Sequence, residues 1–154
     1  MRAYLLKIVF AFAAIAMSFG VQAADPRASK DEAVAFVRKA VDFIKQNGKE
    51  KAFAEFSKPK GQFVDRELYI AVLDMNGVML AHGANPKLIG KSLLEIKDVH
   101  GKAFVREQVE VAKTKGSGWV DFEWVNPVSQ KMEPRSTYLE RTGDYFVLSG
   151  VYGK

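Results

Sequence analysis

A turn signal between two short apolar runs is the feature that most constrains this chain. The tetrapeptide Asp74-Met75-Asn76-Gly77 separates residues 68–73 from residues 78–82. Asn-Gly readily adopts the positive φ that tight hairpin turns require. The segment therefore predicts a β-hairpin of two antiparallel strands.

A helical pattern precedes this hairpin. Between residues 29 and 56 the apolar side chains recur mainly at helical spacing. Ser29, with Glu32 three residues later, fits a capping box, in which a hydroxyl and a carboxylate satisfy free backbone N–H groups. Asn47-Gly48 interrupts the pattern. The segment predicts either one long kinked helix or two helices joined by a turn.

The rest of the chain alternates between one helical pattern and three strand-like runs. Residues 101–115 predict a second helix, and strands are expected at residues 119–124, 132–140 and 145–152. The last three strands follow each other as hairpins, whereas a longer connection with the helix joins strands two and three. A single α+β domain with a five-stranded antiparallel sheet and a PAS-like architecture is the simplest topology.

The first 23 residues predict a secretory signal peptide. A short basic start with Arg2 and Lys7 precedes an apolar run and the small-residue ending Val21-Gln22-Ala23. We expect cleavage after Ala23, and an uncleaved amino-terminal anchor is the alternative. The domain would then comprise residues 24–154 and be free in a periplasm. No later stretch approaches the ~20 apolar residues of a membrane-spanning helix.

Composition excludes several kinds of chemistry. The chain has no cysteine, so disulfides, thiolate metal sites and cysteine nucleophiles are absent. The formal net charge is only +5 and comes without a Lys/Arg cluster, which argues against a nucleic-acid partner. His82 and His100 lack the spacing of a zinc site, and no nucleotide or nucleophile motif occurs. We therefore expect no enzyme activity, no metal and no cofactor.

Several segments in series resemble a type-2 single Cache domain. Residues 68–86 are similar to the central hairpin of that family. Further motifs agree with it in order and spacing: Leu88-Ile89-Gly90-Lys91, Lys97-Asp98, Gly101-Lys102, Gly118-Trp119-Val120, Trp124-Val125-Asn126-Pro127, Arg135-Ser136-Thr137-Tyr138 and Ser149-Gly150-Val151-Tyr152. The resemblance covers essentially all of the chain after residue 23.

The resemblance implies an extracytoplasmic sensor domain that holds small molecules, often short carboxylates, in a pocket on the sheet. Members that signal are anchored by transmembrane segments and carry an output domain, and neither is recognised in this sequence. We therefore expect a secreted domain that binds a small organic acid and passes any message on through another protein, such as a membrane receptor.

The carboxy-terminal strands offer the residue types that such a pocket needs. Arginine can hold a carboxylate through two parallel N–H···O bonds, and the family resemblance favours a basic residue shortly before the strand tyrosine, here Arg135. The other expected ligand-binding residues are hydrogen-bond donors or aromatic walls, namely Tyr138, His82, Tyr69, Trp119, Phe122 and Tyr145. In a regular strand Arg135 and Tyr138 point to opposite faces, so a shared pocket requires a bulge, for which Pro134 is a candidate cause.

The sequence is also compatible with a second function. The chain can instead be a module that docks on a membrane receptor or another periplasmic protein and has no ligand of its own. That reading predicts an exposed apolar patch, for example on the first helix. The same helix could form a homodimer, because its apolar side suits a dimer contact as well as a sheet.

Overall fold

The computed structural model describes residues 27–153, so the expected signal peptide lies outside the described residues. The chain begins with helices α1 (Lys30–Asn47) and α2 (Lys49–Phe56). Ser29 and Glu32 form the predicted capping box at the start of α1. Gly48, with φ of 79°, separates the two helices, so the expected break produces two helices and not one kinked helix.

Five strands form one antiparallel sheet, as predicted. They are β3 (Ala71–Asp74), β4 (Met79–His82), β5 (Ser117–Val125), β6 (Met132–Thr142) and β7 (Tyr145–Tyr152), in the spatial order β4-β3-β7-β6-β5. The Asn76-Gly77 turn joins β3 to β4. A small hairpin of β1 (Val64–Asp65) and β2 (Leu68–Tyr69) precedes the sheet, so the predicted run of residues 68–73 is divided between two strands.

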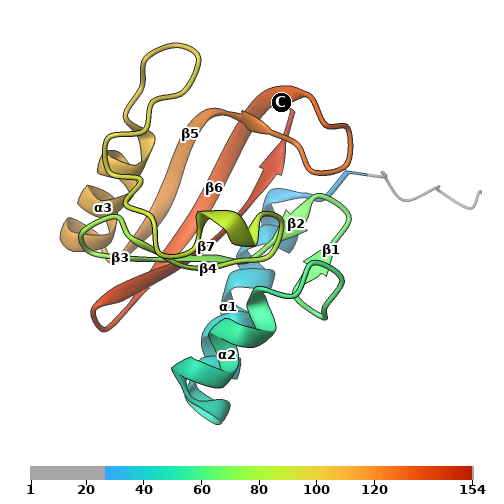
Figure 1. Cartoon of the computed structure of the whole chain (residues 1–154), viewed down its shortest axis with the longest axis vertical. Coiled ribbons are helices and arrows are strands. Elements are labelled where there is room, and N and C mark those ends of the chain that lie inside the picture. Colours follow the sequence, from blue (N-terminus) through green and yellow to red (C-terminus); the bar gives the residue numbers. More distant parts are fainter. Residues whose placement is uncertain (1–26, 154) are drawn as a thin grey trace, which may run out of the picture.

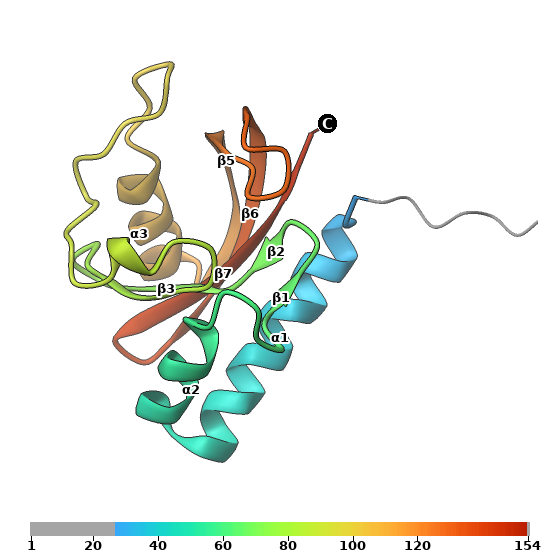
Figure 2. The ribbon, with the colours of Figure 1, turned by 45° about the vertical axis from the view of Figure 1, so that its right-hand side comes forward.

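Helices cover both faces of this sheet (Figures 1 and 2). The pair α1 and α2 packs on one face, which we call the α1 face. On the opposite face, the α3 face, lie α3 (Phe104–Thr114) and the long connection from β4, which includes the short helix η1 (Pro86–Leu88). Each face has its own hydrophobic core, because successive residues of a strand point to opposite sides.

The strand register is regular around Pro134. The pairs of β5 with β6 and of β6 with β7 continue without a shift along their whole length. Among the paired strands of the described chain, the only register shift lies between Val72 and Leu73, in the β3–β4 pair and away from Pro134. The expected bulge at Pro134 is therefore absent, and Arg135 and Tyr138 remain on opposite faces.

The apolar side of α1 is covered by the sheet. Its buried residues, Ala33, Val37, Ala40, Val41 and Ile44, belong to the cores on the α1 face. The large apolar side chains that are exposed in residues 27–153 all lie elsewhere: Ile89, Val99, Val125, Val128 and Met132. The apolar patch that a docking role predicted is thus not found on α1. In that same part of the chain, none of the helices is long and apolar enough to cross a membrane.

Candidate ligand-binding site

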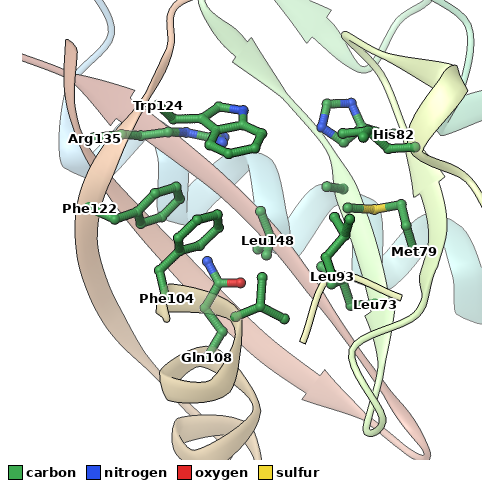
Figure 3. Close-up of a pocket in the computed structure, with 13 residues that line it drawn as sticks. Leu73, Met79, His82, Leu93, Phe104, Gln108, Phe122, Trp124, Arg135 and Leu148 are labelled. Carbon is green, nitrogen blue, oxygen red and sulfur yellow. The ribbon is translucent and has the colours of Figure 1, made fainter. Parts of the chain in front are cut away.

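A small cavity lies between the sheet and α3, within the core of the α3 face (Figure 3). Its volume is about 30 Å³, which is room for about two water molecules. The walls are mostly apolar, and the cavity is lined by Ala71, Leu73, Met79, His82, Leu88, Leu93, Phe104, Val105, Gln108, Phe122, Trp124, Arg135 and Leu148. None of these lining residues is acidic.

Arg135 enters the cavity from β6 by crossing the neighbouring strand. Its partner across the β6–β7 pair is Tyr152, and Gly150 lies two residues away on the same face of β7. A Cβ atom at Gly150 would stand 3.0 Å from Arg135 Nε and 2.6 Å from the carbonyl oxygen of Ser136. Glycine at this position therefore gives the arginine side chain the space it occupies.

The Arg135 guanidinium is buried among aromatic rings. The residue is only 4% exposed, and its Cζ lies 4.5 Å from the ring centre of Tyr69, 5.2 Å from that of Tyr152 and 5.9 Å from that of Phe122. Nη1 donates a hydrogen bond of 2.6 Å to the Tyr69 hydroxyl. Nε and Nη2 have no hydrogen-bond partner among residues 27–153, and no carboxylate there pairs with the charge.

Two tyrosine hydroxyls support Arg135 at this end of the cavity. Tyr152 donates to the carbonyl oxygen of Val125 at 2.9 Å, and its hydroxyl lies 3.4 Å from that of Tyr69. Burial raises the pKa of Tyr152, so this hydroxyl stays protonated. Because Tyr152 gives its one proton to Val125, Tyr69 is the donor in the contact between the two hydroxyls.

His82 lies across the cavity from Arg135 and Trp124 (Figure 3). Burial, and secondarily the charge of Arg135, lowers the pKa of His82 to about 3, so the ring is neutral. Its Nδ1 accepts backbone N–H bonds from Ala84 at 3.2 Å and Asn85 at 2.8 Å. The proton of a neutral imidazole must then be on Nε2, which makes His82 a fixed hydrogen-bond donor at the rim of the cavity.

Four of the seven residues expected from the sequence come together here. Arg135, His82 and Phe122 line the cavity, and Tyr69 hydrogen-bonds to Arg135. Whether these residues bind a ligand stays a proposal.

The other three expected residues lie on the α1 face. Tyr138 and Tyr145 are part of the core beneath α1, and Trp119 packs against Tyr138 with ring centres 5.4 Å apart. The expectation that these three share a pocket with Arg135 is wrong, because the unbroken register of β5, β6 and β7 sends them to the opposite side.

Sequence reasoning also missed parts of the wall. Phe104 stacks on Phe122 with ring centres 4.0 Å apart, and Trp124 meets Phe104 edge-on. Gln108 adds a polar group from α3. Strand alternation could have found Trp124, since it is two residues from Phe122. The residues on α3 gave no comparable signal, because their position depends on how the helix docks.

The site offers little for catalysis or metal binding in the part of the chain that the structure describes. No group of three His, Asp or Glu side chains there is placed to hold a metal ion. What the arrangement can do is present a buried cation and a fixed N–H donor to a small anion.

The fold and this cavity define a PAS-like sensor domain. The chain belongs to the family described as Single Cache domain 2, whose model matches residues 13–152. Cache domains of this kind are extracytoplasmic sensor domains of chemoreceptors and are not typically enzymes. The sequence resemblance is thereby confirmed.

Individual relatives agree with the family. The chain is 30% identical over 90 residues to the methyl-accepting chemotaxis protein McpP of Pseudomonas putida, which is 57% of this chain but only 16% of that receptor. A methyl-accepting chemotaxis protein from Vibrio parahaemolyticus has a TM-score of 0.70 at 24% identity, covering 80% of this chain and 87% of that one. A Cache chemosensory domain solved for its carboxylic acid recognition has a TM-score of 0.70 at 25% identity, covering 80% and 92%.

Proposed function

We propose that this domain binds a short carboxylic acid, with Arg135 as the group that holds the carboxylate. The single observation that carries the proposal is the state of the Arg135 guanidinium, which is buried and has two nitrogen atoms without a partner. A buried charge without a counter-charge is strongly unfavourable, so a bound carboxylate would stabilise the guanidinium.

The surrounding donors suit an anion. A carboxylate needs hydrogen bonds to replace the water that it loses on burial. Arg135 can supply N–H groups on two nitrogen atoms and His82 an Nε2–H group. Because no acidic residue lines the cavity, an ammonium group on the ligand would find no counter-charge there, which favours simple acids over amino acids.

The size of the cavity limits the rest of the ligand. A volume of about 30 Å³ within apolar walls has room for about two water molecules, so the walls must move apart even for a short acid, and the cavity favours the smallest acids. The similarity to a Cache domain that recognises carboxylic acids supports the same ligand class. We further propose that the domain acts outside the cytoplasm after removal of its signal peptide, and that its message passes to a membrane receptor.

Isothermal titration calorimetry with acetate, propionate, pyruvate and lactate tests the proposal. We expect at least one acid to bind the wild-type protein. Arg135→Met should lower the affinity for that acid by about 100-fold or more, because a charged hydrogen-bonded pair is lost. Arg141→Met is the matched control, because Arg141 is an exposed arginine on the same face of β6.

The result separates the alternatives. Binding that survives in Arg135→Met would contradict the assignment of the site. An absence of binding by every acid would contradict the proposed function and favour a domain that works by docking on another protein.

A further inference from the structure

Gln108 is the second buried polar side chain in the cavity wall whose hydrogen-bonding capacity is not used up. It extends from α3, is 2% exposed and lies among apolar neighbours that include Phe104 and Leu148. Its one hydrogen bond to the described residues runs from Nε2 to the Thr137 hydroxyl at 3.3 Å. A glutamine side chain can make four hydrogen bonds, so three of the four are not made with the described residues.

The orientation of the Gln108 amide is fixed by a chain of two hydrogen bonds. The carbonyl oxygen of Val120 can only accept, so Thr137 must donate its hydroxyl proton to it, at 3.1 Å. The Thr137 oxygen is then left as an acceptor, which requires the N–H side of Gln108 to face it. The Oε1 atom is therefore directed away from Thr137.

That oxygen faces the cavity. Figure 3 shows the Gln108 amide beside Phe104, with its oxygen directed toward the space between α3 and the strands. Among residues 27–153 no donor forms a hydrogen bond with it. The atom is not fully enclosed by protein, since the fully buried side-chain atoms without a partner are those of Arg135 and Ser149 alone among residues 27–153. This end of the cavity is therefore open to a hydrogen-bond donor.

The two polar groups line the same small cavity. Arg135 and Thr137, which holds the Gln108 amide, are two residues apart on one face of β6, so their backbone positions are separated by about 6.5 Å along the strand. A ligand within this cavity that contacts both Arg135 and Gln108 must therefore have a short carbon chain. Since no acidic residue lines the cavity, a hydroxyl is a better donor for Gln108 than an ammonium group.

We propose that Gln108 determines specificity, with its Oε1 accepting a hydrogen bond from a hydroxyl at the end of the ligand remote from the carboxylate. The inference rests on the proposed function, because it concerns the other end of the same ligand. Thr137 is a positioning residue, since it acts only by holding the amide. The ligand class is thereby narrowed to short acids with a terminal hydroxyl.

Calorimetry with three acids of equal chain length tests this proposal. The probes are propionate, 3-hydroxypropionate and the 2-hydroxy isomer lactate. We expect the wild-type protein to bind 3-hydroxypropionate about 10-fold or more tightly than propionate, because only that hydroxyl reaches Gln108. The hydroxyl of lactate is next to the carboxylate, so lactate should gain nothing from Gln108.

Two variants identify the residue responsible. Gln108→Met keeps the length of the side chain and removes the acceptor, so the preference for 3-hydroxypropionate should vanish while propionate still binds. Thr137→Val keeps the shape of the side chain and frees the amide, so it should reduce the same preference without altering Gln108 itself.

Four results would overturn the proposal. One is equal binding of propionate and 3-hydroxypropionate by the wild-type protein. Another is an equal loss of both acids in Gln108→Met, which would indicate a purely structural role. If instead neither acid binds the wild-type protein while another short acid does, only the specificity proposal is wrong; if no acid binds at all, the proposed function is wrong as well.

Discussion

The two faces of the sheet bury their side chains in different ways. On the α1 face, Phe63 packs edge to face with Phe43 and Phe56, and the rings of Phe43 and Phe56 are tilted; the ring centres are 4.6–6.1 Å apart. On the α3 face, Arg135 and Gln108 interrupt the apolar wall and a cavity remains. Close apolar packing stabilises a fold, whereas voids and unpaired polar groups destabilise it. The α1 face therefore supplies stability, whereas the α3 face gives some of it up to the cavity and its two polar side chains.

The contrast has one exception on the α1 face. Ser149 is fully buried there, in register with Tyr138, and its hydroxyl has no hydrogen-bond partner among the described residues. A lone hydroxyl is much less unfavourable to bury than a guanidinium. The difference between the faces in the burial of polar groups is therefore one of degree.

Gly150→Ala should have the largest effect on the α3 face. The new Cβ would lie 2.6 Å from the Ser136 carbonyl oxygen and 2.7 Å from Thr137 Cγ2, so the backbone must shift. We expect a loss of about 3 kcal/mol in the free energy of unfolding, measured by chemical denaturation, together with loss of acid binding. Gly90→Ala is the control, because its Cβ meets nothing within 4 Å and only the positive φ of 82° is strained; an equal loss in both variants would contradict the steric explanation.

Arg135→Met removes the buried arginine charge from the α3 face. The substitution removes a buried charge without a counter-charge and fills similar space, so we expect the free energy of unfolding to rise by about 1–3 kcal/mol in the absence of ligand. The same variant should lose acid binding. Thermal unfolding without added acid measures the gain, and a clear destabilisation would mean that the guanidinium is better compensated than its contacts indicate.

Low pH should reduce the free energy of unfolding through His82, which lies on the α3 face. The pKa of this residue falls from an ordinary 6.5 to about 3 in the folded protein, so the unfolded chain binds the proton more readily. Stability from the neutral ring is complete above about pH 6.5 and is lost as the pH falls toward 3, by about 1.4 kcal/mol per pH unit. Unfolding free energies measured between pH 4 and 7 should show this slope in wild type and in His100→Asn, whose histidine is exposed. A persistent slope in His82→Asn would assign it to other groups.

Much of the fold could be predicted because its signals are local. The Asn76-Gly77 turn, the capping box at Ser29 and the break at Gly48 each depend on residues close together in the chain, and all three are found in the structure. The short β1–β2 hairpin was missed, since two-residue strands leave no detectable alternation.

The candidate site could be predicted only in part because it depends on strand parity and on reach between elements. In a regular strand Phe122 and Trp119 point to opposite faces and cannot line one pocket, whereas Phe122 and Trp124 share a face and can. The course of Arg135 over Gly150 depends on the pairing of β6 with β7, and the place of Gln108 depends on how α3 docks. Neither the course of the arginine nor the place of the glutamine can be predicted from local sequence patterns.

The smallest expected effect is that of Tyr138→Phe, which tests whether the two faces are independent. The Tyr138 hydroxyl donates to Glu140 Oε1 at 2.7 Å on the α1 face, and this bond is partly exposed. Its removal should lower the free energy of unfolding by about 1 kcal/mol or less. Acid affinity should not change, because the sheet lies between this hydroxyl and the cavity, and a calorimetric comparison with wild type measures both quantities. A loss of affinity beyond about threefold would show that the α1 face does more than support the sheet, since a packing change would then be transmitted through β6 from Tyr138 to Arg135.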